Sequence, residues 1–301
     1  MTISGAVVQT QREASTRHQT RDVVSSLRLH WPEYLMEASE MAIYMFLACA
    51  FATLLQHPAS PIRHLIASAI SRRAILGLAM GATVIAIVMT PWGKQSGGHF
   101  NPAVTVTFFR LGKVKFWDAT FYAAAQFSGA LCGVVIATYV LRGALENDAV
   151  QYAVTVPGVY GSTAAFVAEL TISSVLMITI LFVSNRDSVA RYTPYFVGAL
   201  YAIYIAFETP FSGMSMNPAR TFGSAFPAGI WDALWIYFTA PTLGMLIAAE
   251  AFLKFRGGVP PSCAKLHHAN HKRCIFHCGY QTESVGASGG SLISMARLPN
   301  A

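Results

Sequence analysis

Charged residues are scarce in this sequence. Asp, Glu, Lys and Arg make up 12% of its 301 residues, whereas soluble domains carry about 25%. Hydrophobic residues reach 54%, and the mean hydropathy is +0.45. A soluble protein of this length would need more charge on its surface, so the deficit indicates a membrane protein.

The first 30 residues contain no continuous apolar stretch, so we expect no cleavable signal peptide. Their polar composition predicts a disordered segment. The sequence after about residue 256 is also polar, and its stretch GASGGS is typical of a flexible chain. We therefore divide the chain into a polar N-terminal tail (1–32), a membrane domain (33–254) and a C-terminal tail (255–301).

Between the two tails the chain holds long apolar stretches. A transmembrane helix needs roughly 20 largely apolar residues to cross a hydrocarbon core of about 30 Å. Six segments are candidates, of which the fifth is short. They lie at about 34–55, 74–92, 117–140, 163–184, 194–210 and 231–253.

Basic residues outnumber acidic ones, 21 to 14, which gives a formal net charge of +7. With both termini in the cytoplasm, sixteen of the 21 Lys and Arg fall on the cytoplasmic side. This asymmetry follows the positive-inside rule, although Arg63, Arg72 and Arg73 in the first outer loop oppose it. The excess positive charge is therefore accounted for by basic residues on the cytoplasmic side of the membrane, and we predict no nucleic-acid partner. A plasma membrane, the inner membrane of a bacterium, is the expected location.

The triplet Asn-Pro-Ala occurs twice, in SGGHFNPAVT (96–105) and in SMNPARTFG (215–223). Each copy lies within a half of the chain that has three predicted spans. An odd number of spans forces two successive halves to insert in opposite orientations, as in the inverted repeats of many transport proteins. We therefore predict two inverted repeats, at about 33–142 and 163–254.

The segments after the two triplets, 102–109 and 218–225, are too short to cross a bilayer, since eight helical residues span about 12 Å. Asn as N-cap and Pro at the first helical position favour a helix start at each. If both starts meet at the midplane, two positive dipole ends and the amides of Asn101 and Asn217 form a polar waist that repels cations. A single Asn-Pro-Ala triplet is a common helix start and says little, whereas two triplets in matching places of two halves are a specific signal for a pore.

These segments resemble those of the aquaporin family, also called the major intrinsic proteins. SGGHFNPAVT is similar to the family's SGAHxNPAVT, and AAQFSGALCG to its Gln-containing third span. In that span Gly129 and Gly133 form a GxxxG that permits close helix packing. The resemblance covers 33–254 and implies an all-α membrane protein with six transmembrane helices, two re-entrant half-helices, one pore per subunit and a homotetramer.

The resemblance also gives pore-lining or structural roles to His99, Glu37 and Glu169. A helix-end carboxylate at the membrane interface is the alternative for the two glutamates, and neither role makes them catalytic. At the outer constriction the resemblance places a set of four side chains: Arg220, Ile205, Met214, and Met80 or Gly81.

This chain departs from the family's patterns at Ile205 and at Thr221, the residue after Arg220. Strict water channels usually carry His where this chain has Ile205, and glycerol facilitators usually carry Asp where it has Thr221. An apolar Ile and flexible Met side chains leave selectivity open. We expect water to pass, with glycerol, urea or ammonia as further candidate permeants.

The sequence thus predicts a passive channel for water that needs no cofactor in its pore. A facilitator chiefly for glycerol or another small neutral solute is the nearest alternative. Two others are a poorly conducting membrane scaffold or adhesion protein, and a coupled transporter using Glu37, Glu40 or Glu169 as proton carriers. An enzyme is not expected, because the polar residues within the spans form no nucleophile–base set.

The C-terminal tail contains CAKLHHANHKRCIFHC, which has three Cys and four His in a short stretch. Structural zinc sites use four Cys or His ligands, so a zinc site is one hypothesis. A solvated tail with reduced thiols is the main alternative, because the spacing matches no standard zinc finger, and a haem or redox-sensing role is a further one. Disulfides are disfavoured in a reducing cytoplasm. The candidate ligands are Cys263, His267, His271, Cys274, His277 and Cys278.

Overall fold

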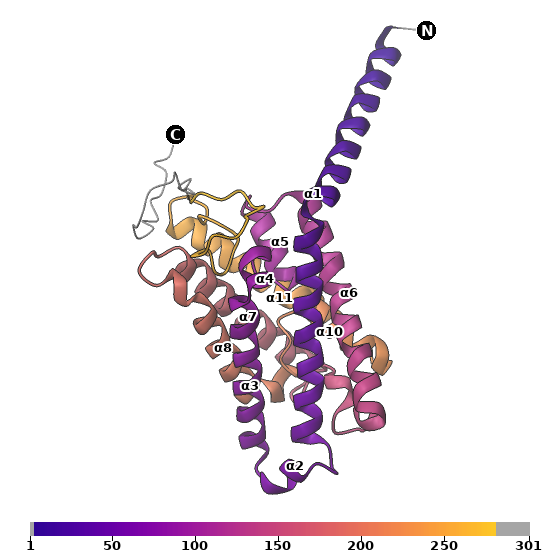
Figure 1. The fold of residues 1–301 in the computed structure, drawn as a ribbon, viewed down its shortest axis with the longest axis vertical. Helices are drawn as coiled ribbons and strands as arrows, with labels where there is room; N and C mark the ends of the chain where they lie inside the picture. The colour runs from indigo at the N-terminus through magenta and orange to yellow at the C-terminus, as the bar shows by residue number, and fades with distance from the viewer. Residues whose placement is uncertain (1–2, 281–301) are drawn as a thin grey trace.

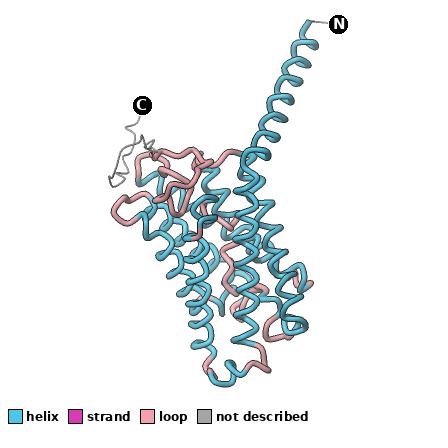
Figure 2. Tube along the Cα trace, in the orientation of Figure 1, coloured by secondary structure: helices cyan, strands magenta, loops and turns pink. Residues whose placement is uncertain are grey.

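The computed structural model describes residues 3–280, with side chains from Asp22 onward. The predicted flexible stretch GASGGS therefore lies outside the described residues. Helices joined by loops run roughly along one long axis (Figure 2). The N-terminus and the last described residues of the C-terminal tail lie toward the same end of the bundle (Figure 1).

Six long helices build the bundle. They are α1 (Ile3–Gln56), α3 (Ala69–Met89), α6 (Phe116–Leu141), α7 (Gly161–Ser184), α8 (Thr193–Phe207) and α11 (Leu234–Phe255). Within residues 3–280, all of these except α8 contribute a stretch long and apolar enough to cross a membrane. The 15-residue α8 corresponds to the fifth predicted span, which the sequence already marked as short.

Shorter helices connect them or enter the bundle from one side. They are α2 (Pro61–Leu65), α4 (Pro91–Ser96), α5 (Pro102–Arg110), α9 (Thr209–Ser212), α10 (Pro218–Ala228) and the 3-10 turns η1 (Arg142–Glu146), η2 (Gln151–Ala153) and η3 (Ala190–Tyr192).

The N-terminal tail differs from its prediction. We expected disorder over the first 30 residues, but α1 is continuous from Ile3 and projects beyond the bundle (Figure 1). Pro32 lies inside this helix. A helix already fixed by packing extends residue by residue without a new nucleation cost, which explains how a polar stretch continues it.

The packing of the helices follows the predicted repeat. Helix α1 packs on α6, and α7 packs in the same way on α11. The half-helix α5 of the first repeat packs on α11 of the second, while α10 of the second packs on α6 of the first. Because each half-helix packs against a helix of the other repeat as well as one of its own, the two repeats place their short helices at one shared centre.

Large apolar side chains cover the outside of the bundle, as expected where lipid is the solvent. Examples from four different helices are Leu78, Val135, Val167 and Leu243, between 46% and 66% exposed.

Candidate functional site

The two half-helices α5 and α10 begin as the sequence predicted, each with an extended Asn followed by Pro. Asn101 Oδ1 accepts a hydrogen bond from the backbone N–H of Ala103 at 2.9 Å. Asn217 Oδ1 accepts from Ala219 at 3.0 Å and from Arg220 at 3.2 Å. These bonds satisfy N–H groups that a helix start leaves without partners, and they fix the orientation of both amides.

The amide nitrogens of the two caps connect the repeats. Asn101 Nδ2 donates to the carbonyl oxygen of Met216 at 2.7 Å, and Asn217 Nδ2 donates to that of Phe100 at 2.8 Å. An amide nitrogen carries two N–H groups, so one remains on each after this bond. On Asn217 the sulfur of Met41, a weak acceptor, lies 3.7 Å from the nitrogen. Each cap is therefore bonded to the loop of the other repeat, at the place where the sequence predicts the polar waist.

Glu37 holds the loop that leads into the first half-helix. Its carboxylate accepts the backbone N–H groups of His99 at 2.9 Å and Phe100 at 2.7 Å, and the Gln126 amide at 2.7 Å. Phe100 has a positive φ of 28°, a conformation that a non-Gly residue keeps only when its surroundings enforce it.

Glu169 does the same in the second repeat. Its carboxylate accepts the backbone N–H groups of Ser215 and Met216, both at 2.7 Å, and the Ser212 hydroxyl at 2.7 Å. Met216 has a φ of 55°. Both glutamates are fully buried, which does not fit carboxylates at the membrane interface and supports a structural role.

Two tyrosines support the same loops, and sequence reasoning missed them. Tyr122 donates its hydroxyl hydrogen to the carbonyl oxygen of Ser96 at 2.7 Å, and Tyr237 donates to that of Ser212 at 2.6 Å. Each follows the Asn of its own repeat by about 20 residues. The equal spacing in the two repeats was the sequence signal that could have identified these tyrosines.

A cavity of about 330 Å³ is bounded by α1, α3, α8 and α10, and the residues that line it include Met80, Ile205, Met214 and Arg220. The structure thus brings all four expected constriction residues together. Gly81 faces α8 instead, since a Cβ built on it would lie 2.4 Å from the carbonyl oxygen of Gly198. Met80 is therefore the lining residue of the two alternatives.

Arg220 is the polar member of this set of four. Its Nη1 nitrogen is buried and has no hydrogen-bond partner among the described residues. The neighbouring Thr221 hydroxyl is bound to those of Thr155 at 2.7 Å and Ser215 at 2.6 Å. An Arg donor at the wall of this cavity, which Tyr44, Gln56 and Arg73 also line, can orient a neutral molecule that has lone pairs and can repel a cation.

His99 lies on the other side of the waist. Its ring stacks between those of Phe108 and Phe276, at centroid distances of 5.2 and 5.4 Å. Nδ1 lies 3.1 Å from the Thr105 hydroxyl, and Nε2 lies 2.8 Å from the carbonyl oxygen of Ala264. Through Phe276 and Ala264 the C-terminal tail contacts the loop before Asn101.

The C-terminal tail gathers part of its predicted ligand set. The Sγ atoms of Cys263, Cys274 and Cys278 and a ring nitrogen of His268 lie within 4.8 Å of one another. The candidates His267, His271 and His277 do not belong to this group, so the expected histidines are corrected to His268. The reason is local: Asn270 bonds to the His267 carbonyl oxygen and the Lys272 N–H, and this turn leaves His271 exposed.

The positions of the other two histidines follow from their partners. His277 is exposed and donates its backbone N–H to Lys113, with Nδ1 at 2.9 Å from the Gly112 carbonyl oxygen. His267 is buried, 6% exposed, and burial lowers its pKa.

Comparison with known proteins connects this geometry to a family. Residues 24–252 match the family described as Major intrinsic protein. Aquaporin NIP2-3 of Zea mays is 32% identical over 185 residues, which cover 62% of this chain and 60% of the relative. Aquaporin TIP4-4 of Zea mays is 30% identical over 192 residues, covering 62% and 75%. The chain thus spans about 60% of the length of the first of these relatives.

A solved structure has the same fold. The X-ray structure of the aquaglyceroporin from Plasmodium falciparum superposes with a TM-score of 0.63 at 22% identity, over 74% of this chain and 95% of that chain.

Proposed function

This chain belongs to the major intrinsic protein family, and we propose that it is a passive channel for water and small uncharged solutes. The observation that carries the proposal is the waist, where the caps Asn101 and Asn217 exchange hydrogen bonds with the opposite loop. Two helix starts directed at one point repel cations, hydronium included, and leave N–H donors for a neutral molecule.

Water is the proposed main permeant, and a small solute such as glycerol, urea or ammonia is the second. The second is favoured by the cavity wall, where Met80, Ile205 and Met214 are apolar while Arg220, Arg73 and Gln56 supply polar groups. A solute with both C–H and O–H groups matches such a wall. The relatives' names, aquaporin and aquaglyceroporin, agree with either cargo.

The buried carboxylates support passive flux over proton-coupled transport. Glu37 and Glu169 already accept backbone N–H bonds that hold the two loops. Glu40 accepts from the Ser96 hydroxyl at 2.9 Å. A carrier that loaded and released a proton here would have to give up these bonds in every cycle.

We further propose a homotetramer in the plasma, or inner, membrane with both termini in the cytoplasm. The apolar outer surface fits a bilayer, the two described ends lie toward the same side (Figure 1), and the basic residues are concentrated on that side.

Stopped-flow light scattering on reconstituted liposomes tests the proposal. Vesicles with the channel should shrink in sucrose faster than empty vesicles, and re-swelling in glycerol would show solute passage. Shrinkage no faster than in empty vesicles would overturn the channel proposal and favour a poorly conducting scaffold protein, provided that protein with and without zinc in its C-terminal tail gives the same result. A flux that requires a proton gradient would favour coupled transport.

A further inference from the structure

We propose that Cys263, His268, Cys274 and Cys278 bind one Zn²⁺ ion, and that this ion holds residues 259–280, the tail cap, over one mouth of the pore. The metal site follows from the tail's own geometry. The effect of the cap on flux rests on the proposed channel function.

The ligand atoms already lie around a common point. Cys263 Sγ is 3.6 Å from Cys274 Sγ, and Cys278 Sγ is 3.0 Å from His268 Nε2. Tetrahedral zinc with Zn–S near 2.3 Å and Zn–N near 2.0 Å separates neighbouring ligand atoms by roughly 3.5–3.8 Å. A disulfide needs about 2.05 Å, and all five cysteines of the chain, each within the described residues, are free thiols.

The donor set identifies the metal. Three thiolates and one imidazole form a Cys₃His set, which is typical of structural zinc. Soft sulfur ligands disfavour magnesium and calcium. Cys274 and Cys278 have three residues between them, within the usual spacing of two to four. Four protein ligands leave no open position, so the site is structural and not catalytic.

The surroundings of the cluster complete it. The His268 ring stacks on Tyr280 at a centroid distance of 4.5 Å, which orients the imidazole. Three thiolates and Zn²⁺ carry a net charge of −1, and the Lys265 ammonium, 2% exposed, is within electrostatic range of all three cysteines. The same ammonium donates to the carbonyl oxygens of Lys272 and Arg273 at 3.2 and 2.6 Å, which joins the two arms of the tail.

Apart from its contacts with the bundle and the Lys265 bonds, the tail cap has no regular secondary structure to fix its fold. Residues 259–280 contain no helix in the structure, yet Cys263, Ala264 and Leu266 are between 0% and 4% exposed. A segment this short rarely buries enough apolar surface to order itself, and natural cases use a metal or disulfides as a staple. Zinc binding would supply that ordering free energy.

The tail cap covers the loop that descends to Asn101. Leu266 donates its backbone N–H to the Gly97 carbonyl oxygen at 3.0 Å. Ala264 and Phe276 both contact His99. A molecule leaving the waist along this loop therefore meets the tail before bulk water.

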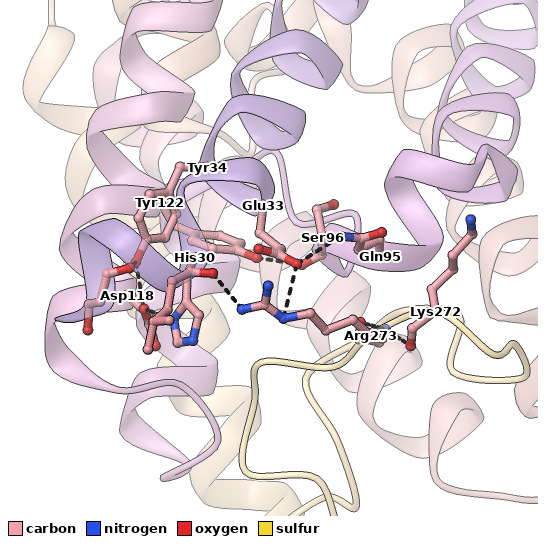
Figure 3. Close-up of polar contacts among 12 residues, drawn as sticks. His30, Glu33, Tyr34, Gln95, Ser96, Asp118, Tyr122, Lys272 and Arg273 are labelled. Carbon is pink, nitrogen blue, oxygen red and sulfur yellow. Dashed lines mark hydrogen bonds and ion pairs between the residues drawn. The ribbon is translucent and has the colours of Figure 1, made fainter. Parts of the chain in front are cut away.

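The tail cap is anchored on both repeats. Its Ser262 N–H donates to Asn185 Oδ1, just after α7, at 2.6 Å. On the opposite side Arg273 extends toward α1, where it donates to the Leu29 carbonyl oxygen at 2.6 Å and lies 3.7 Å from Glu33 (Figure 3). Because these anchors lie on different helices around the mouth, the cap spans it, and loss of the metal should free it.

Metal analysis of the full-length purified protein tests the site. We expect one zinc per chain by elemental mass spectrometry, and a zinc content close to zero in Cys274→Ser. In His268→Ala the affinity for zinc should fall more than about 100-fold, since even changes to residues that only support the ligands lower metal affinity by roughly 10–100-fold. Matched controls are Cys132→Ser, a thiol in α6, and His271→Ala, the exposed neighbour. Both should keep one zinc per chain.

Cobalt substitution supplies a readout that does not depend on how well a variant folds. Wild-type protein loaded with Co²⁺ should show thiolate-to-cobalt charge-transfer absorption that zinc abolishes. Absence of this band, zinc content unchanged in Cys274→Ser, or a Cys263–Cys274 disulfide found by mass spectrometry would each overturn the metal site.

Measurements of water flux then test the role of the tail cap separately from the proposed channel function. In liposomes, water permeability should rise when zinc is removed by a chelator and in Cys274→Ser, and stay at the wild-type value in Cys132→Ser. Equal permeability with and without zinc, at rates above empty vesicles, would overturn the cap's control of the pore. Rates equal to empty vesicles in every form would overturn the proposed function and leave the zinc measurement standing.

Discussion

Gly129 in α6 lies directly against the backbone of Ala38 in α1, and a Cβ built on it would be 2.1 Å from the Ala38 carbonyl oxygen. Gly133 repeats the relationship one turn later against Ala42, at 2.3 Å. The two helices are thus in backbone contact, as the GxxxG pattern predicted. This contact sets Gln126, one turn before Gly129, beside Glu37 and so supports the loop into the waist.

Gly129→Ala should therefore destabilise the protein. The added methyl group forces α1 and α6 apart, and overpacking of this kind costs about 1–3 kcal/mol. Gly143→Ala is the matched control, because nothing lies within 4 Å of a Cβ there. Thermal unfolding in detergent, followed by size-exclusion chromatography, should give a lower midpoint for Gly129→Ala alone. Equal midpoints would show that the helices separate without cost.

Asn217→Ala should lower water permeability. It removes the cap of α10, worth about 1 kcal/mol, and the waist hydrogen bond to Phe100, worth another 0.5–1.5 kcal/mol approximately. The Asn217 amide has a second N–H, held only by the weak acceptor sulfur of Met41, and we expect the variant to lose this donor for the permeating molecule as well. Asn101→Ala should behave alike, because its bonds are the counterpart in the other repeat.

Asn147→Ala is the control for these two variants, since its Oδ1 accepts from Ala149 in an exposed turn. In stopped-flow measurements, Asn147→Ala should conduct water as fast as wild type, and Asn101→Ala and Asn217→Ala should both be slower. If Asn217→Ala conducted water as fast as wild type while folded, the waist would not be the narrow polar site of the pore.

The waist was predictable because its signals are local. An Asn followed by Pro specifies a helix start within a few residues, and the two copies in opposed halves specify where the starts meet. The constriction needed the resemblance as well, since Met80 and Arg220 come from distant helices. The choice between Met80 and Gly81 depends on which of the two neighbouring residues of α3 faces the cavity, and sequence spacing alone does not decide this.

Other features depend on tertiary contacts that sequence spacing does not encode. The tail histidines illustrate this: four occur within eleven residues, and the turn held by Asn270 decides that His268 joins the cysteines. The helical extension of α1 contradicts its polar composition because the packed part of the helix nucleates it.

Arg220→Ala should raise proton leakage and preserve water flux. The guanidinium places a positive charge at the cavity wall, and unit charges 4 Å apart repel by about 4 kcal/mol at an effective dielectric constant of 20. Arg73→Ala is the control, because Arg73 lines the same cavity but donates to the Ala206 carbonyl oxygen. A pH-sensitive dye inside liposomes measures the leakage. Proton flux at the wild-type level in Arg220→Ala would mean that the helix starts alone exclude cations.

Ile205→Ala should raise glycerol permeability. Ile205 lines the same cavity as the donor Arg220, and truncating its apolar side chain widens the cavity without leaving a polar group unpaired. A tenfold rise would correspond to about 1.4 kcal/mol off the barrier. Ile203→Ala, the same substitution on the same helix at a side chain 51% exposed on the outer surface, controls for any effect on α8 itself.

Re-swelling of vesicles in glycerol gives the comparison, with shrinkage in sucrose as the measure of water flux. Because water is smaller than glycerol, its permeability should change less than that of glycerol. A rise in glycerol flux in both variants would point to a loosened helix. No rise in either would place the limiting step for solutes at the waist, between Asn101 and Asn217, where each amide is already held by the opposite loop.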